Sequence, residues 1–161
     1  MAKDITIRAA TEADVPTLGR LGALLVKLHH DLDAKRFIPA TPQTEEGYSW
    51  FLGTQVKKRD VIVLVAESEG KVVGYTYAGI EGVDYMALRG PAGALYDIVV
   101  DPPHRGQGVG RQLLTATLAA LKERGAPRVV LSTAQGNEAA QHLFEALGFR
   151  RTMIEMTREL E

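Results

Sequence analysis

The stretch Arg105-Gly106-Gln107-Gly108-Val109-Gly110 follows an apolar segment at residues 94–100 and leads into a helical pattern. Its glycines alternate with other residues, so backbone N–H groups can converge on an anion without obstruction by side chains. A helix that begins here adds its unpaired N–H groups and the positive end of its dipole at the same point. The order of strand, glycine loop and helix N-terminus predicts a phosphate-binding site.

Two other kinds of phosphate loop do not match this stretch. A dinucleotide fingerprint requires Gly-x-Gly-x-x-Gly, and a P-loop requires Gly-Lys followed by Ser or Thr. Here Gly110 is followed by Arg111. An ordinary strand-to-helix turn is the alternative interpretation of the glycines. The loop by itself therefore predicts an anion site and does not identify the ligand.

The composition is that of one soluble globular domain, which we place at residues 1–161. The net charge of −1 gives no electrostatic support for nucleic acid or an anionic membrane as a partner. The absence of cysteine excludes disulfides, thiolate metal sites and a cysteine nucleophile. Residues 1–4 lack a signal-peptide core and no apolar run is long enough to span a bilayer, so we expect a cytoplasmic protein.

The N-terminal third of the chain predicts one strand and two helices. Apolar residues alternate with polar ones over residues 5–7, which indicates a short strand. Thr11 has the character of an N-cap with Asp14 in a capping-box arrangement, and the helix that follows fades near Asp33. Thr and Pro at residues 41 and 42 predict the start of a second helix, which runs through residue 56.

The remainder predicts alternating strands and helices around an irregular loop at residues 79–93. Helices are expected after the glycine loop, ending at Gly125, and from Asn137 to Gly148. The expected strands are residues 61–67, 72–80, 94–100 and 128–133, with one or two terminal strands in residues 149–160. The pattern indicates a single mixed α/β domain.

Three features in this order resemble the GCN5-related N-acetyltransferase (GNAT) family. They are Tyr96-Asp97-Ile98-Val99-Val100-Asp101-Pro102, the glycine loop, and a helix from Asn137 that ends in Leu147-Gly148-Phe149. The family's cofactor loop reads Arg/Gln-x-x-Gly-x-Gly/Ala, a pattern that this loop fills. The resemblance implies a mixed α/β fold with a central, mostly antiparallel, twisted sheet of six to seven strands. It also implies helices on both faces and fourth and fifth strands that splay apart.

The resemblance further implies acetyl-CoA as co-substrate. Its pyrophosphate would bind the N–H groups of the glycine loop, and its pantetheine arm would lie along the strand at residues 94–100. A strand N–H would polarise the thioester carbonyl, and Asn137 would lie at the far side of the cofactor. The expected cofactor-binding residues are Ile98, Val99, Val100, Arg105, Gly106, Gln107, Gly108, Val109, Gly110, Arg111, Asn137 and Phe144.

Acetyl transfer to an amine also needs proton transfer, because an amine with a pKa of about 10.4 arrives protonated. Many relatives carry a tyrosine in the last helix that protonates the departing thiolate. The matching residue here is Phe144, which has no proton to give. General acid–base assistance is worth about 10²–10⁴-fold, so some activity can survive without it. Tyr96 is our first choice for a replacement donor.

The general base is left open between three residues. Some polyamine-acetylating relatives carry a glutamate at the position of Tyr96 and an aspartate at that of Asp97. Strand alternation places Tyr96 on the face of Ile98 and Val100 and Asp97 on the opposite face, so both reach one amine only if a bulge intervenes. Glu81 can act through a water. A purely structural role for Asp97 is an equal alternative.

We therefore expect an N-acetyltransferase that transfers acetyl from acetyl-CoA to an amine of a small molecule or peptide. The alternative is a catalytically weak acyl-CoA-binding sensor, which Phe144 keeps open. The run His29-His30-Asp31-Leu32-Asp33 has metal-binding residue types, but a solvated helix end is the better interpretation and no metal is expected. The resemblance also makes a homodimer through the C-terminal strands plausible. The sequence does not identify the acceptor.

Overall fold

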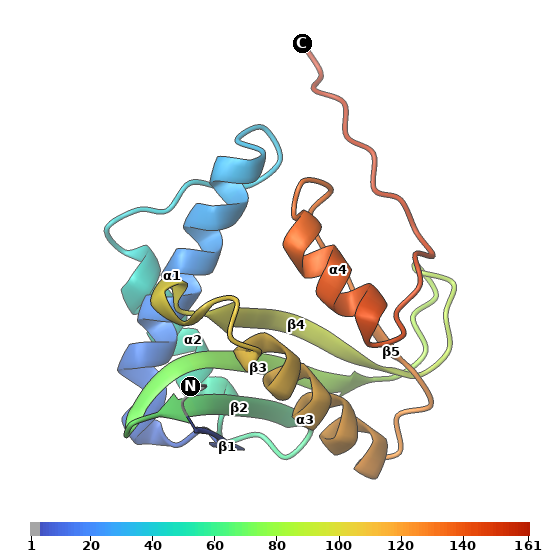
Figure 1. The fold of residues 1–161 in the computed structure, drawn as a ribbon. Helices are drawn as coiled ribbons and strands as arrows, with labels where there is room; N and C mark the ends of the chain where they lie inside the picture. The colour runs from blue at the N-terminus through green and yellow to red at the C-terminus, as the bar shows by residue number, and fades with distance from the viewer. Residues whose placement is uncertain (1–3) are drawn as a thin grey trace.

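A computed structural model describes residues 4–161 and shows one open sheet with helices on both faces (Figure 1). The strands are β1 (Ile5–Ala9), β2 (Val61–Ser68), β3 (Lys71–Glu81), β4 (Ala92–Val100) and β5 (Val129–Leu131). The helices are α1 (Val15–Leu32), α2 (Thr44–Gln55), α3 (Val109–Glu123) and α4 (Glu138–Ala146), with 3-10 turns η1 (Glu12–Asp14) and η2 (Pro102–His104). The strands lie in sequence order, and only β4 and β5 are parallel. The predicted mixed α/β fold and mostly antiparallel sheet are confirmed.

The sheet separates two apolar cores. The first core lies under α1 and α2, and the second lies under α3 and α4. Burial of each large apolar side chain contributes roughly 1.5–3 kcal/mol, which makes these cores the main source of stability. The first core is formed by Leu18, Leu21, Leu52, Val63, Val65, Tyr75 and Val99, and the second by Ile62, Ala78, Leu95, Leu114, Leu121 and Phe144.

Two glycines of α1 allow α2 to approach it closely. A Cβ atom at Gly19 would lie 1.8 Å from Oγ of Ser49, and one at Gly22 would lie 2.1 Å from the ring of Tyr48. Any larger residue at these positions would force the helices apart, because these contacts are far below van der Waals distance. The close approach holds the Tyr48 ring between α1 and the sheet.

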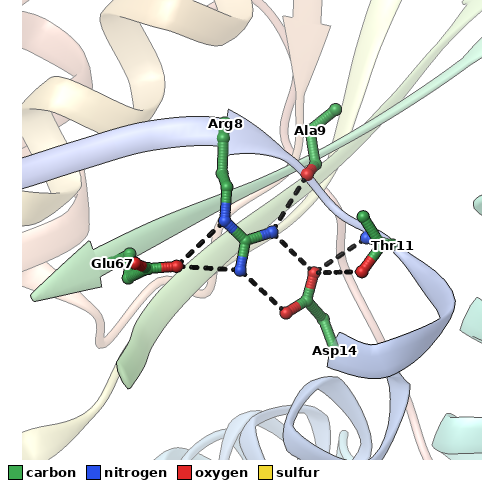
Figure 2. Close-up of polar contacts among 5 residues, drawn as sticks. All are labelled: Arg8, Ala9, Thr11, Asp14 and Glu67. Carbon is green, nitrogen blue, oxygen red and sulfur yellow. Dashed lines mark hydrogen bonds and ion pairs between the residues drawn. The ribbon is translucent and has the colours of Figure 1, made fainter. Parts of the chain in front are cut away.

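Arg8 of β1 joins the edge of the sheet to the start of α1 (Figure 2). Its guanidinium donates to Oε2 of Glu67 on β2 at 2.9 Å and to Oδ2 of Asp14 at 2.8 Å. The N–H of Thr11 donates to the same Asp14 oxygen at 2.7 Å. The predicted capping interaction between Thr11 and Asp14 is confirmed, and α1 begins directly after it.

The splayed strands that the resemblance implies are present. Pairing between β4 and β5 covers only three residue pairs and ends at Leu95 with Leu131. Beyond that point β4 continues to Val100 beside β3 alone. Among residues 4–161, no strand covers the second hydrogen-bonding edge of residues 96–100.

The strand count differs from the expected six to seven, because the described residues form five strands. The prediction of terminal strands in residues 149–160 is wrong. That segment forms no strand, and side-chain ion pairs of Arg36 with Glu155 and of Arg151 with Glu145 hold it instead. Figure 1 shows it running outward past α4. The start of α2 is also later than predicted, at Thr44, because a hydrogen-bonded turn precedes it.

Candidate functional site

The glycine loop has the backbone conformation of an anion cradle. Gly106 has φ of 72° and Gly108 has φ of 82°, the left-handed region that glycine adopts without strain. A Cβ atom at either position would meet no protein atom within 4 Å, so open space lies in front of the loop. Gly108 is the N-cap of α3, whose first N–H groups have no partner within the helix. These groups are available to a phosphate.

Side chains of the loop tie it to the end of β4. Nε of Arg105 donates to the carbonyl of Val100 at 2.9 Å, and the Gln107 amide donates to the carbonyl of Pro103 at 3.3 Å. A Cβ at Gly110 would lie 3.4 Å from the side chain of Leu143, so α3 begins close against α4. The open edge of β4 thus leads directly into the cradle.

The second signature of the sequence has a visible structural role. Oδ1 of Asn137 accepts a hydrogen bond from the N–H of Ala140 at 3.2 Å and caps α4. Phe144 is 6% exposed and contacts Phe149 edge-on, with ring centroids 5.9 Å apart. Phe144 therefore lies within the core beneath α4, and its ring has no hydroxyl to offer.

A bulge in β4 changes which way one of the predicted catalytic residues, Tyr96, points. Tyr77 pairs with Asp97 and Ala78 pairs with Leu95, which leaves Tyr96 as the extra residue. The Tyr96 ring lies 4.8 Å from that of Tyr77, and Asp97 bonds to residues of the same core. The alternation expected for an unbroken strand is therefore wrong at Tyr96. Tyr96 and Asp97 both lie on the side of α1 and α2.

Asp97 lies beneath two tyrosines. The hydroxyl of Tyr75 donates to its Oδ2 at 2.9 Å, and the hydroxyl of Tyr48 donates to the same carboxylate. Burial raises the pKa of Asp97, while these two hydrogen bonds and the charge of His29 act in the opposite direction. Burial also raises the pKa of both tyrosines well above the ordinary value, and the charge of Asp97 adds to this. Both tyrosines remain protonated donors.

Glu81 and Tyr96 form a second polar group on this face. The Tyr96 hydroxyl donates to Oε1 of Glu81 at 2.7 Å, and Arg89 forms an ion pair with the other carboxylate oxygen. Burial raises the pKa of Tyr96, and the bond to Glu81 raises it further. The Tyr96 ring lies across Gly79, where a Cβ would be 3.3 Å away. Its hydroxyl is therefore directed over β3 rather than toward the gap between β4 and β5.

His29 lies near the C-terminal end of α1, in a stretch that the sequence favoured as a solvated helix end, and it is partly buried. Its Nδ1 is 2.8 Å from the carbonyl of Leu25, and its ring contacts Phe37 edge-on at 4.9 Å. Its charge acts on the carboxylate of Asp97. No sequence signal connects the two residues, because they lie 68 positions apart on α1 and β4. Within residues 4–161, no three His, Cys, Asp or Glu side chains are grouped as metal ligands.

Comparison with known proteins identifies relatives that are named as acetyltransferases. The sequence profile described as the acetyltransferase (GNAT) family matches residues 26–149. Mycothiol acetyltransferase of Thermobispora bispora is 41% identical over 96 residues, which are 57% of this chain and 31% of that protein. N-acetyltransferase 8B of Homo sapiens is 40% identical over 88 residues, 55% of this chain and 38% of that protein. The chain thus spans about a third of the length of these curated relatives.

Solved structures share the fold over almost the whole chain. A mutant of the BH1408 protein from Bacillus halodurans has a TM-score of 0.81 at 22% identity and covers 97% of this chain and 99% of its own. Aminoglycoside N-acetyltransferase AAC(6')-Iy in complex with CoA has a TM-score of 0.73 at 19% identity, covering 99% and 97%. In the described part of the chain, no helix has the length and apolar character needed to cross a membrane.

Proposed function

Because the chain belongs to the acetyltransferase (GNAT) family, whose members use acetyl-CoA, we propose that it transfers acetyl to a primary amine of a small molecule or peptide. The amine would attack the thioester directly while both substrates are bound, so the protein's main contribution is to hold the two in reacting geometry. One observation carries this proposal: an uncovered edge of β4 runs into a glycine cradle at the start of α3. That arrangement suits an extended ligand that ends in a pyrophosphate.

The residues around the glycine loop and the open edge of β4 fit coenzyme A. The cradle leaves room in front of Gly106 and Gly108, and the N–H groups up to Arg111 would bind the pyrophosphate. Backbone groups of Ile98, Val99 and Val100 would bond the pantetheine amides, as a neighbouring strand would. An N–H on this edge would stabilise the negative charge that develops on the thioester oxygen. Asn137 and Phe144 would border the same gap from α4.

The acceptor would bind on the opposite side of the gap, at the face covered by α1 and α2. Asp97 places a carboxylate there, and a carboxylate attracts the ammonium form of an amine. Glu81 and Tyr96 add a second polar group nearby, which would hold another polar part of the acceptor. We propose these three residues as the polar floor of the acceptor site.

The thiolate would leave without a tyrosine acid in α4. A thiol pKa near ~8.5 makes the thiolate a tolerable leaving group at neutral pH. The lost assistance is at most about 10²–10⁴-fold. Phe144 also gives weight to the second candidate function, an acyl-CoA-binding sensor with little turnover.

Turnover of acetyl-CoA against a panel of amines tests the proposal, with free thiol as the readout and binding of CoA measured separately by calorimetry. Release of thiol that depends on one class of amine supports the transferase. Tight binding of acetyl-CoA without amine-dependent release favours the sensor. Failure to bind CoA contradicts both functions.

We also propose that a second copy of the chain covers the C-terminal segment. The apolar side chains of Met153, Ile154, Met156 and Leu160 are exposed, and the outer edge of β5 is unpaired. The ion pair of Arg36 with Glu155 joins the segment to the residues that follow α1. Sedimentation should therefore give a dimer, and replacing Ile154 and Met156 by glutamate should give a monomer. A native chain that sediments as a monomer refutes this.

A further inference from the structure

His29 lies on the side of α1 that faces the proposed acceptor site. It follows Gly22 by seven residues, or about two helical turns, so the two residues share one side of the helix. Gly22 is the contact point of the Tyr48 ring, and the Tyr48 hydroxyl bonds to Asp97. One turn after His29, the side chain of Leu32 is 3.7 Å from a Cβ built at Gly136, in the connection from β5 to α4. The C-terminal end of α1 thus extends from β4 toward the β5 side of the gap between β4 and β5.

The hydrogen bond at Nδ1 of His29 determines which ring nitrogen carries the proton. The carbonyl of Leu25 can only accept, so Nδ1 of His29 carries the proton and donates it at 2.8 Å. In the neutral ring the lone pair then lies on Nε2. The edge contact with Phe37 holds the ring plane. Within the described residues Nε2 has no hydrogen-bond partner, so its lone pair is available to a ligand.

The carboxylates of the site are already engaged. Asp97 accepts from Tyr48 and Tyr75, and Glu81 accepts from Tyr96 and pairs with Arg89. Protonation of the Asp97 oxygen that Tyr75 contacts, or of either Glu81 oxygen, would disrupt one of these interactions. His29 has no such obstacle at Nε2.

We infer that Nε2 of His29 accepts the proton that the acceptor amine loses during acetyl transfer, and that the Leu25 carbonyl and the Phe37 ring position the imidazole. This inference rests on the proposed transferase function. The amine nitrogen forms a bond to the acetyl carbon, and the carbon–sulfur bond breaks with its electron pair on sulfur. The nitrogen's proton moves to Nε2 of His29. The imidazolium then returns it to the thiolate or to water, which regenerates the neutral ring and leaves free CoA thiol.

Chemical rescue tests this role. Two variants distinguish the loss of the proton acceptor from a loss of structure. His29→Ala removes the ring and leaves space for added imidazole. His29→Asn keeps a donor for the Leu25 carbonyl and lacks Nε2. We expect kcat/KM for the amine to fall by about 10²–10³-fold in both, with unchanged affinity for acetyl-CoA. Imidazole should restore at least about tenfold in His29→Ala, and substituted imidazoles should rescue in order of their basicity.

His30→Ala is the matched control, since Nδ1 of His30 bonds to the carbonyl of Phe37 at 2.9 Å on the neighbouring side of α1. It should keep native turnover and show no response to imidazole. Native turnover in His29→Asn, or a loss in His29→Ala that no imidazole restores, overturns the role of His29 and leaves the transferase intact. A native chain that releases no thiol with any amine overturns the proposed function and this inference with it.

Discussion

The hydroxyl of Tyr75 on β3 donates to Oδ2 of Asp97 on β4 at 2.9 Å, from a ring that is completely buried. The bond joins neighbouring strands on one face of the sheet, and the other edge of β4 is the uncovered one. It therefore connects the first core directly to the proposed reaction site. Because Tyr75 cannot move without disturbing that core, it fixes one oxygen of Asp97 in place. The carboxylate is thus positioned by the fold itself.

Tyr75→Phe should destabilise the protein by about 1.5–3 kcal/mol, the range for a hydrogen bond to a charged group. The bond lowers the pKa of Asp97, so its loss should raise that pKa further. Urea unfolding and the carboxyl ¹³C resonance of Asp97 measure the two effects. Tyr77→Phe is the control, since its hydroxyl bonds to the neutral amide of Gln55 at 3.1 Å. An Asp97 titration that is identical in Tyr75→Phe and the native chain contradicts this account.

Asp97→Asn should leave stability at neutral pH equal to or above that of the native chain. Burial raises the pKa of Asp97 above its ordinary 3.8, so the folded protein keeps this proton to higher pH than the unfolded chain. The stability from protonated Asp97 is complete below 3.8 and is lost as the pH rises through the folded pKa. Unfolding by urea across acidic and neutral pH should show the native chain losing stability relative to Asp97→Asn. A variant that is markedly weaker at neutral pH would show that the ionised carboxylate stabilises the fold.

The glycine loop and the helix start of the proposed donor half could be predicted from the sequence because they are local. The cradle needs glycines at Gly106 and Gly108 and a helix immediately after them, and all of these are consecutive residues. The order of strands and helices followed from periodicity for the same reason. The splayed strands came from the family resemblance, since the short pairing of β5 has no signal in its own residues.

The proposed acceptor half could be predicted only in part, because Asp97 was a candidate from the sequence but its partners come from separate elements. His29, Tyr48, Tyr75 and Asp97 come from α1, α2, β3 and β4. The bulge at Tyr96 inverts the expected alternation, and no residue type marks it. The prediction of terminal strands was wrong for a different reason. Residues 149–160 form no strand although the outer edge of β5 is free, and ion pairs to Arg36 and Glu145 hold the segment instead.

Arg8 should be coupled strongly to Asp14 and weakly to Glu67 (Figure 2). Asp14 is 7% exposed, so Arg8→Met would leave a nearly buried carboxylate without its cation. We expect a loss of about 2–3 kcal/mol, below the 3–5 kcal/mol of a fully buried pair, because the Arg8 side chain is 35% exposed. The coupling to Glu67, which is 31% exposed, should stay below about 1 kcal/mol. Double-mutant cycles with Asp14→Asn and Glu67→Gln measure both couplings, and equal values would refute the distinction.

The ion pair between Arg8 and Asp14 also predicts how the stability of the protein changes at acidic pH. Arg8 lowers the pKa of Asp14 below its ordinary 3.8. The stability from this pair is therefore present above 3.8 and is lost as the pH falls through the folded pKa. Arg8→Met should remove that part of the acid unfolding profile, whereas Glu67→Gln should largely retain it.

Gly108→Trp should abolish binding of CoA while the protein stays folded. A side chain at this position meets no protein atom within 4 Å, so it projects into the space in front of α3. The left-handed φ of 82° adds about 1–2 kcal/mol of strain for a residue with a Cβ. Gly108→Asn is the control, because asparagine tolerates this conformation and is small. Calorimetry should show a loss of more than about 100-fold for tryptophan and much less for asparagine. Equal affinities in both variants would place the pyrophosphate elsewhere.

Tyr96→Phe separates two roles for the bulge residue. The ring keeps its contacts with Gly79 and Tyr77, and only the hydrogen bond to Glu81 is lost. Since that hydroxyl is directed over β3, we expect the KM of the amine to rise about three- to tenfold, or roughly 0.7–1.4 kcal/mol, with little change in kcat. Glu81→Gln should behave in the same way, because it removes the charge from the same group. Steady-state kinetics with saturating acetyl-CoA measures both constants. A fall in kcat of about tenfold or more at unchanged KM would instead show that Tyr96 protonates the leaving thiolate, the role that Phe144 cannot fill.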